Sequence, residues 1–301
     1  MAVQSHFFSV GSLVSWAEAG VGAVATQSVV EPAYGPRGLA LMRDGKSAPA
    51  ALHQLLGDDP AESVRQVAIV DRAGRVAVHT GTRCIAQAGH AVGEQVSAQA
   101  NIMERDTVPG AMVHAYSESS ANGLAERLLA ALEAAEREGG DLRGRQSAAM
   151  VVVAPRATGS PTEDTPVDLR VEDHPDPVRE LRRLVGMKRA YGRADAGDQL
   201  AMAGDVEGAL AEYEAAHRLQ PENLELAFWH GVALAANGRE AAAAPILRRA
   251  FEAHAGWIEL LKRLPAAGLF PDDGELIARL AGTRAVSEPT HPLSEPTQPP
   301  L

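Results

Sequence analysis

The chain has 301 residues, a formal net charge of −11, 46% hydrophobic residues and a single cysteine, Cys84. This length suffices for about two domains with a sizeable core, but an acidic chain is a poor ligand for nucleic acid or for an anionic membrane surface. The sequence has neither an apolar run of about 18 residues nor a secretion signal, and a lone cysteine fits the reducing cytoplasm, so we expect a cytoplasmic protein without membrane or nucleic-acid partners.

The first strands are predicted from β-branched residues and turn signals. Residues 64–70 are rich in valine and isoleucine and run into the turn sequence 71–74. Residues 75–79 then supply a partner strand. The Gly20-Val21-Gly22 segment matches a relaxed dinucleotide fingerprint, but strand-like residues follow it where that fingerprint needs a helix. A tight turn between strands is the better interpretation.

A helix and two further strands follow. Residues 124–138 carry leucines every four positions and end at Gly139-Gly140, which predicts a helix and its stop signal. Residues 147–154 form a nearly continuous apolar run, typical of a strand buried on both faces. Residues 167–171 alternate apolar and charged side chains, typical of a half-buried strand, and 156–166 form the loop between these two. Hairpins together with helices predict layered α and β structure with antiparallel sheets.

After a helix at 177–189, the sequence repeats with a period of 34 residues. Small residues recur in pairs at Gly197/Gly231, Gly204/Gly238, Ala209/Ala243 and Ala216/Ala250, and Tyr213/Leu247 and Pro221/Ala255 keep the same spacing. This period, with small residues where paired helices cross, is the tetratricopeptide pattern. Residues 257–264 and 273–280 are predicted capping helices, because each repeat buries its face on a neighbour.

The sequence patterns divide the chain into three segments. Residues 1–186 form the α/β domain, 187–282 the tetratricopeptide-like helical repeats, and 283–301 a tail. The tail repeats Ser-Glu-Pro-Thr at 287–290 and 294–297 and is rich in proline. We predict that it is disordered.

Four blocks of the first segment together resemble a known family. They are residues 16–27, 32–39, 139–147 and 167–174. In this order and spacing they are similar to the bacterial family DUF1028, a domain of unknown function, over residues 2–188. That family is grouped with the N-terminal-nucleophile hydrolases. The resemblance therefore implies an αββα sandwich, and it suggests cleavage of amide bonds without naming a substrate. The 34-residue period predicts an all-α repeat domain behind this sandwich.

The start of the chain departs from the family pattern. Relatives begin one strand earlier, with a threonine whose hydroxyl attacks the amide and whose α-amine, with a pKa near 8, takes the proton. Here the first residue after removal of Met1 is Ala2, which has no nucleophile. Either the enzyme is inactive or the nucleophile lies upstream of Met1. Relatives often have a valine at this position, and a valine codon such as GTG also serves as a bacterial start codon, so we suspect that the start has been assigned too late. A sheet without its first strand would also leave an exposed edge or a gap under the helices, and an exposed edge favours homo-oligomers.

Two residues are candidate catalytic groups. Ser5 lies on the first available strand as a weak candidate nucleophile, and it is more plausible as a wall of the pocket. Its neighbour His6 points to the opposite face and is not positioned as its base. Asn101, at the end of a short strand, has an amide that suits a developing oxyanion or, equally, a cap for the next turn.

Four residues are candidate ligand-binding groups. Thr26 and Gln27 end the first family block, and Arg145 and Gln146 lie between a helix and a buried strand, where an arginine fork suits a carboxylate. For the nearby Asp141 we favour a structural pairing with arginine.

Other chemistry has little support in the sequence. The carboxylates at Asp168, Glu172 and Asp173 lack a second acid for glycosidase chemistry, and nothing suggests that Cys84 has a lowered thiol pKa with His90 as its base. The histidines lack metal-ligand spacing, so we expect neither metal nor cofactor. Phe228, Trp229 and His230 are explained by helix packing, although a partner peptide could dock near them.

Two functional hypotheses remain. In the first, a hydrolase-like domain binds or cleaves a small amide, and the repeats recruit a protein or peptide partner. In the alternative, the α/β domain is a non-catalytic ligand-binding or scaffold unit, and the protein acts as an adaptor through its repeats.

Overall fold

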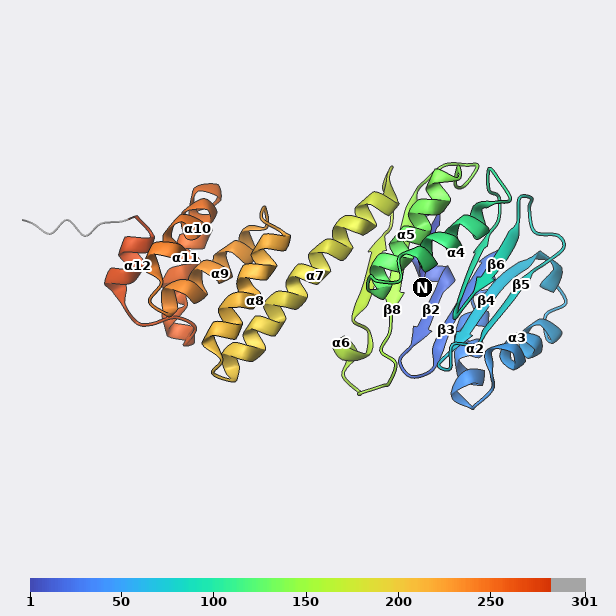
Figure 1. Ribbon diagram of the computed structural model, residues 1–301, viewed down its shortest axis with the longest axis horizontal. Helices are drawn as coiled ribbons and strands as arrows, with labels where there is room; N and C mark the ends of the chain where they lie inside the picture. The colour runs from blue at the N-terminus through green and yellow to red at the C-terminus, as the bar shows by residue number, and fades with distance from the viewer. Residues whose placement is uncertain (283–301) are drawn as a thin grey trace, which may run out of the picture. The chain divides into compact units, whose positions relative to one another are not determined.

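The structure, a computed structural model, describes residues 1–282 and divides the chain into two compact units (Figure 1). The first unit is Met1–Lys188 and the second begins at Arg189. The tail predicted at 283–301 lies outside the described residues. Each unit is described separately below.

The first unit combines strands and helices. Its strands are β1 (Ala2–Ser5), β2 (Ser15–Glu18), β3 (Gly22–Ser28), β4 (Arg65–Asp71), β5 (Val76–Thr80), β6 (Gly89–Gly93), β7 (Val96–Ala100), β8 (Ser147–Val152) and β9 (Val167–Val171). Its helices are α1 (Gly11–Val14), α2 (Tyr34–Arg43), α3 (Ala48–Gly57), α4 (Val108–Glu118), α5 (Leu124–Arg137), α6 (Pro161–Asp164) and the first part of α7 (Pro177–Met202), with a 3₁₀ turn at Glu62–Val64.

The paired strands are antiparallel throughout. One sheet has the order β2-β3-β4-β5, a second has the order β1-β8-β9, and β6 pairs with β7. The predicted hairpin at 71–74 is confirmed by the pairing of β4 with β5, and Gly74 adopts the left-handed φ of +78° that the turn requires. The predicted antiparallel pairing of the strands at 147–154 and 167–171 is also confirmed.

The tight turn predicted at Gly20–Gly22 is confirmed. It joins β2 directly to β3, which pair antiparallel from Ser15 to Gly22, and no helix begins there. A side chain on Gly22 would overlap the backbone of Val70 in β4. Glycine is therefore required here by close packing of strands, not by a phosphate.

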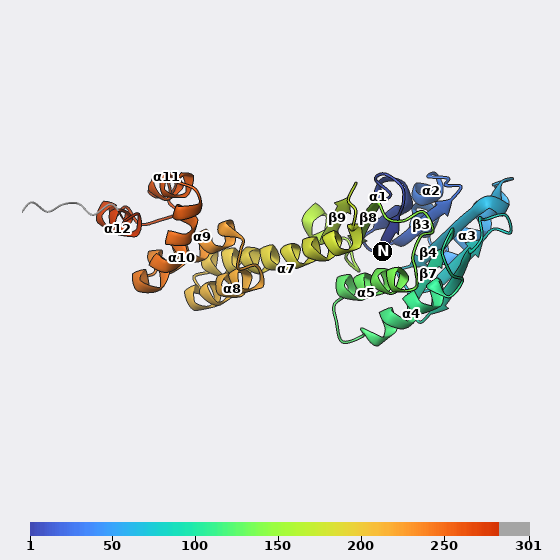
Figure 2. The same cartoon turned by 90° about the horizontal axis from the view of Figure 1, so that it is seen from above.

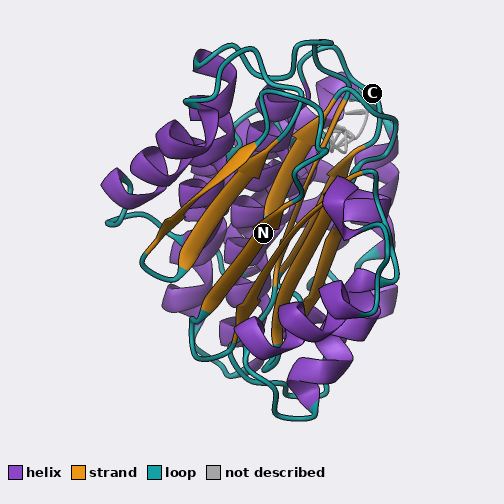
Figure 3. Cartoon of the chain, turned by 90° about the vertical axis from the view of Figure 1, so that its right-hand side faces the viewer, coloured by secondary structure: helices purple, strands orange, loops and turns teal. Residues whose placement is uncertain are grey.

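The first unit is built in layers of helices and strands (Figures 2 and 3). Helices α2 and α3 pack on the sheet β2–β5, where Tyr34, Leu55 and Ile69 form a buried core. Helices α4 and α5 pack on β6, β7, β1 and β8, and a second core there contains Leu129 and Met150. The mixed α/β class predicted for this segment is confirmed.

The second unit is helical. It contains the end of α7, α8 (Val206–Leu219), α9 (Leu224–Ala236), α10 (Glu240–Ala253), α11 (Gly256–Arg263), a 3₁₀ turn at Pro265–Ala267 and α12 (Gly274–Leu280). Helix α7 is longer than the predicted 177–189, because its internal glycines do not break it and the chain first turns at Gly204, with φ of +83°. No helix within residues 1–282 has the length and apolarity needed to cross a bilayer.

Close helix crossings in the second unit depend on two glycines. A Cβ on Gly197 would lie 2.8 Å from the ring of Tyr213, and a Cβ on Gly231 would lie 2.7 Å from Leu247. Gly204 and Gly238 both adopt left-handed φ at the ends of α7 and α9. Corresponding residues 34 positions apart therefore make corresponding contacts.

The aromatic cluster of α9 is explained by packing. Phe228 is fully buried, its ring lies 5.0 Å from that of Trp257 and 5.3 Å from that of Trp229, and it belongs to the core formed by α9, α10 and α12. The packing role predicted for these residues is confirmed.

Candidate functional site

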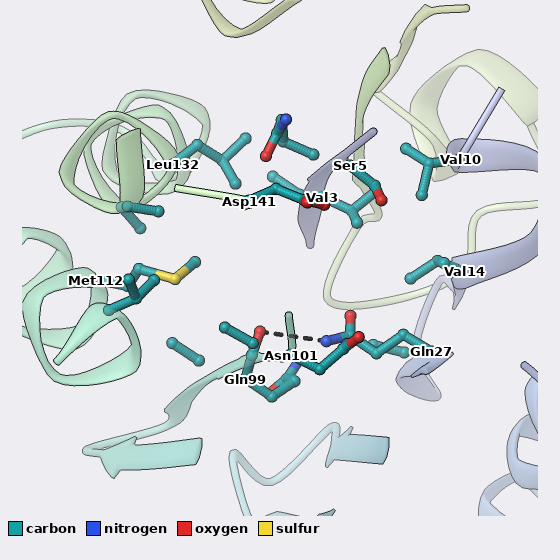
Figure 4. A pocket seen from close by; sticks show the side chains of 18 of the residues that line it. Val3, Ser5, Val10, Val14, Gln27, Gln99, Asn101, Met112, Leu132 and Asp141 are labelled. Carbon is teal, nitrogen blue, oxygen red and sulfur yellow. Dashed lines mark hydrogen bonds between the residues drawn. The ribbon is translucent and has the colours of Figure 1, made fainter. Parts of the chain in front are cut away.

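A cavity of about 250 Å³ lies in the first unit, where β1, β3, β7, α4 and α5 meet. Its apolar wall comes mainly from the helices, through side chains such as Met112, Leu128 and Leu132 (Figure 4). Its polar lining includes Gln4, Ser5, Gln27, Gln99, Asn101, Asp141 and Arg143. An apolar enclosure with a few polar groups is the usual composition of a small-molecule site.

A network of side-chain amides forms the polar floor. Gln66 is fully buried beneath it. Its Oε1 accepts hydrogen bonds from Gln27 Nε2 at 2.6 Å and from Asn101 Nδ2 at 3.1 Å, while its Nε2 donates to the carbonyl of Ala100 at 2.9 Å. Gln27 Nε2 also donates to the carbonyl of Gln99 at 3.3 Å (Figure 4). Gln66 thus fixes the orientation of the two amides that line the cavity.

Two amide groups in the lining have no partner. Gln4 Nε2 and Gln99 Oε1 are buried and make no hydrogen bond within the described residues. An unpaired donor or acceptor in such a place costs on the order of 1–3 kcal/mol. Gln4 and Gln99 both line the cavity, so one unpaired donor and one unpaired acceptor belong to side chains beside it.

The cavity is closed at one end by Asp141. This carboxylate is buried and accepts hydrogen bonds from the Arg143 guanidinium at 2.7 Å and from the backbone N–H of His6 at 3.3 Å. Burial alone would raise the pKa of Asp141, but these donors, together with the Arg143 backbone, hold it below its usual range. Arg143 also donates to Ser5 Oγ at 3.4 Å. Asp141 is therefore a fixed anion and a poor base, in the structural pairing predicted for it.

The predicted site residues are only partly brought together. Ser5, Gln27 and Asn101 line the cavity. Thr26 does not, because it alternates with Gln27 on β3 and is fully buried, where it donates to the carbonyl of Glu31.

Arg145 and Gln146, both predicted as ligand-binding residues, also lie outside the cavity lining. Arg145 pairs with Glu136, and burial raises the pKa of that carboxyl in spite of the pairing. Gln146 donates to Asp173 at 3.2 Å. The turn at Gly144 separates both residues from Asp141 and Arg143, so the predicted cluster is divided between the cavity and the surface.

Other candidate groups have partners that do not suit catalysis. No carboxylate or imidazole among the described residues hydrogen-bonds to Ser5, which therefore has no base in place. Cys84 donates to the carbonyl of Arg65, and His90 bonds to Thr80, so this cysteine and histidine do not form the pair considered from the sequence. Asp168 lies on the exposed side of β9 and pairs with Arg170.

Comparison with known proteins identifies the family. The model of a family of unknown function, DUF1028, matches residues 1–181. The chain belongs to this family. The crystal structure of a DUF1028 protein from Silicibacter pomeroyi is similar to the chain, with a TM-score of 0.55 and 30% sequence identity, over 61% of this chain and 77% of that chain. No curated protein matches.

Three glutamines of this cavity and its floor were not predicted as site residues. Gln4 and Gln66 belong to no motif, and Gln99 was noted only as the neighbour of Asn101, because a glutamine in a strand is usually a solvated residue. Gln66 is the second residue of β4, and a polar residue inside a buried strand is a signal for a hydrogen-bonded role.

Proposed function

We propose that the first unit binds a small amide-containing ligand in the cavity between β1 and β7. The observation that carries this proposal is the pair of buried, unpartnered amide atoms in its lining, Gln4 Nε2 and Gln99 Oε1. An amide group offers one donor and one acceptor, which is the complement of these two atoms. The volume of about 250 Å³ favours a ligand of the size of one or a few amino-acid residues.

The polar floor supports an uncharged ligand. Asp141 and Arg143 neutralise one another at the closed end, and the remaining polar lining near Gln27 and Asn101 consists of amides and hydroxyls. A charged ligand would lose its hydration without gaining a counter-ion. A neutral amide loses less and regains its hydrogen bonds.

The test is a binding screen with small neutral amides, beginning with N-acetylalanine methylamide. Thermal-shift measurements on the full chain identify binders, and their affinities are compared between the wild type and Gln99→Leu. We expect a loss of about threefold to tenfold, the usual effect of one neutral hydrogen bond. Gln54→Leu, an exposed glutamine of α3, is the matched control. Equal affinities for all three proteins would contradict the proposal.

We propose amide hydrolysis as a second candidate function. It is supported by the helix packing, with α2 and α3 on the sheet β2–β5 and α4 and α5 on β6, β7, β1 and β8, which an αββα sandwich of the N-terminal-nucleophile type would also have. Asn101 adds support, because its Nδ2 uses one N–H on Gln66 and retains a second for an oxyanion. Release of amine is measured with the same set of small neutral amides. Turnover that is weakened in Asn101→Leu supports Asn101 as the oxyanion donor, whereas absence of turnover leaves ligand binding as the function.

For the second unit we propose that α7–α10 form tetratricopeptide repeats that bind a protein partner. The corresponding contacts of Gly197 with Tyr213 and of Gly231 with Leu247 support the repeat. A hollow between α7 and α8 is lined by Arg218 and by Arg193, which pairs with Glu212 at 2.9 Å. Arg218 is the cation that favours an acidic segment of the partner. We expect a protein that co-purifies with the wild type from the native host to be lost from Arg218→Glu. An unchanged set of proteins would contradict this proposal.

A further inference from the structure

The cavity is bounded by the free edges of two strands. β1 pairs only with β8, and β7 pairs only with β6. Each strand therefore has one edge without a neighbouring strand. An unpaired edge carries N–H and C=O groups that are ready to bond another strand.

The lining residues show that both edges face the cavity. Side chains of a strand alternate between its two faces, so a cavity over one face is lined by every second residue. Here consecutive residues line it, from Met1 to Ser5 in β1 and from Val96 to Met103 in and after β7. Consecutive lining is expected when the cavity lies beside the strand, in the direction of its hydrogen bonds.

The main-chain groups that point into the gap can be identified from the pairing. Met1 and Val151 exchange both backbone hydrogen bonds. Alternation along an antiparallel pair then directs the backbone groups of Val3 toward β8 and those of Ala2 and Gln4 away from it. Neither Ala2 nor Gln4 has a backbone partner on that side within the described residues.

The edge of β7 is analogous. The carbonyl of Gln99 accepts the bond from Gln27, so the main-chain groups of Gln99 face away from β6. By alternation, those of Ser97 face the same way. The gap thus has backbone donors and acceptors on both of its long sides.

The closed end of the gap shows its width. Asp141 forms an antiparallel bridge with Met103 on one side, and its carboxylate accepts the backbone N–H of His6 on the other. One chain segment therefore spans the distance between the continuations of β7 and β1. The gap beyond it is suited to one further extended segment.

We propose that the ligand of this cavity is an extended peptide of at least three residues, which adds a strand between β1 and β7. This inference rests on the proposed amide-binding function and names the class of ligand. Alternate ligand side chains face two different walls. Ala2 packs toward the core of α4 and α5, which includes Met112 and Leu132, and Val3 packs toward Val14 and Ala25. Aliphatic residues at alternate positions, with a small residue between them, fit these walls.

The probe is acetyl-Val-Ala-Val methylamide, titrated into the ¹⁵N-labelled full chain. We expect the backbone N–H signals of Gln4 and Ser97 to shift and to become protected from exchange. The same peptide N-methylated at its alanine nitrogen has one donor fewer and is the matched control. It is expected to bind about threefold to tenfold more weakly, the usual effect of one hydrogen bond.

Two protein variants separate main-chain from side-chain contacts. Gln4→Ala removes the side chain and keeps the N–H, whereas Gln4→Pro removes both and is tolerated on a strand edge whose N–H is free. We expect Gln4→Pro to bind the peptide about threefold to tenfold more weakly than Gln4→Ala. For both variants, an NMR spectrum similar to that of the wild type shows that the fold is retained.

The outcomes distinguish this inference from the proposed function. Equal binding of the peptide and its N-methylated form, or binding of N-acetylalanine methylamide without binding of the peptide, overturns strand addition and leaves amide binding standing. Failure of both probes overturns both. Weaker binding of the N-methylated peptide and of Gln4→Pro supports strand addition.

Discussion

Within the described residues, the first unit buries five polar side chains and the second buries one. In the first unit these side chains bond to main-chain groups where strands end or turn. Asp71 accepts the N–H of Ala48, and Ser147 bonds to both Phe7 and Val10. Helices satisfy their own backbone, and the second unit buries aliphatic and aromatic residues instead. Buried polar side chains therefore occur where main-chain groups lack a partner within their own helix or sheet. The cavity-lining amides that are not used in this way are the ones that a ligand can bond.

The largest expected effect is that of Gln66→Leu on the first unit. The change removes the hydrogen bonds that Gln66 makes to the carbonyls of Gly89 and Ala100 and to the amides of Gln27 and Asn101. We expect a loss of about 3 kcal/mol or more in the free energy of unfolding, measured with urea. Gln54→Leu, on the exposed side of α3, should change it by less than about 0.5 kcal/mol. Similar losses for both variants would contradict the role given to Gln66.

Side-chain packing should contribute most of the stability of the second unit, and Gly231→Ala tests this. A methyl group there would lie 2.7 Å from fully buried Leu247, so we expect a loss of about 1–3 kcal/mol from overpacking. In the same unit, Gly192 of α7 has open space around it. Gly192→Ala should stabilise the unit by about 0.5–1 kcal/mol through helix propensity. Thermal unfolding of both variants distinguishes overpacking from the general effect of alanine.

His230, the one buried polar residue between Arg189 and residue 282, predicts a pH dependence. The Nδ1 atoms of His230 and His217 lie 3.3 Å apart. Burial lowers the pKa of His217, and the nearby Arg249 lowers it further. Burial also lowers the pKa of His230, where the effect of His217 acts in the same direction and that of Glu214 opposes it. Below about pH 6.5 the unfolded histidines bind protons that the folded ones do not.

The stability of the second unit should therefore fall as the pH decreases from about 6.5. Thermal unfolding at pH 7.5 and at pH 5 is compared between the wild type and the double variant His217→Gln, His230→Gln. The variant should lose less stability between the two pH values. An equal loss in both proteins would exclude these histidines as the cause.

The smallest effect is expected for Gln146→Ala. Gln146 lies outside the cavity, and its side chain makes one hydrogen bond, to Asp173. The change should alter stability by less than about 0.5 kcal/mol and leave the affinity for N-acetylalanine methylamide unchanged. A clear loss of affinity would restore the ligand-binding role predicted from the sequence.

Local patterns predicted the elements better than they predicted the site. The turn at Gly74, the helix that ends before Gly139 and the glycine contacts that recur after 34 residues follow from spacing and glycine chemistry. These act within a few residues or one 34-residue period. The cavity depends on contacts between distant segments. Ser5 and Asn101 were predicted from their positions on or beside strands and Gln27 from the first family block, and all three line the cavity. The separation of Arg145 from Arg143 depends on the left-handed turn at Gly144.

The side-chain amide signals of glutamine and asparagine test the central claim most directly. They are recorded by NMR on the ¹⁵N-labelled full chain while N-acetylalanine methylamide is added. The account predicts shifts for Gln4, Gln27, Gln99 and Asn101, which line the cavity, and none for the exposed Gln54 and Gln199. Saturation without any shift of the four cavity amides, or equal shifts at Gln54 and Gln199, would contradict an amide-binding site between β1 and β7.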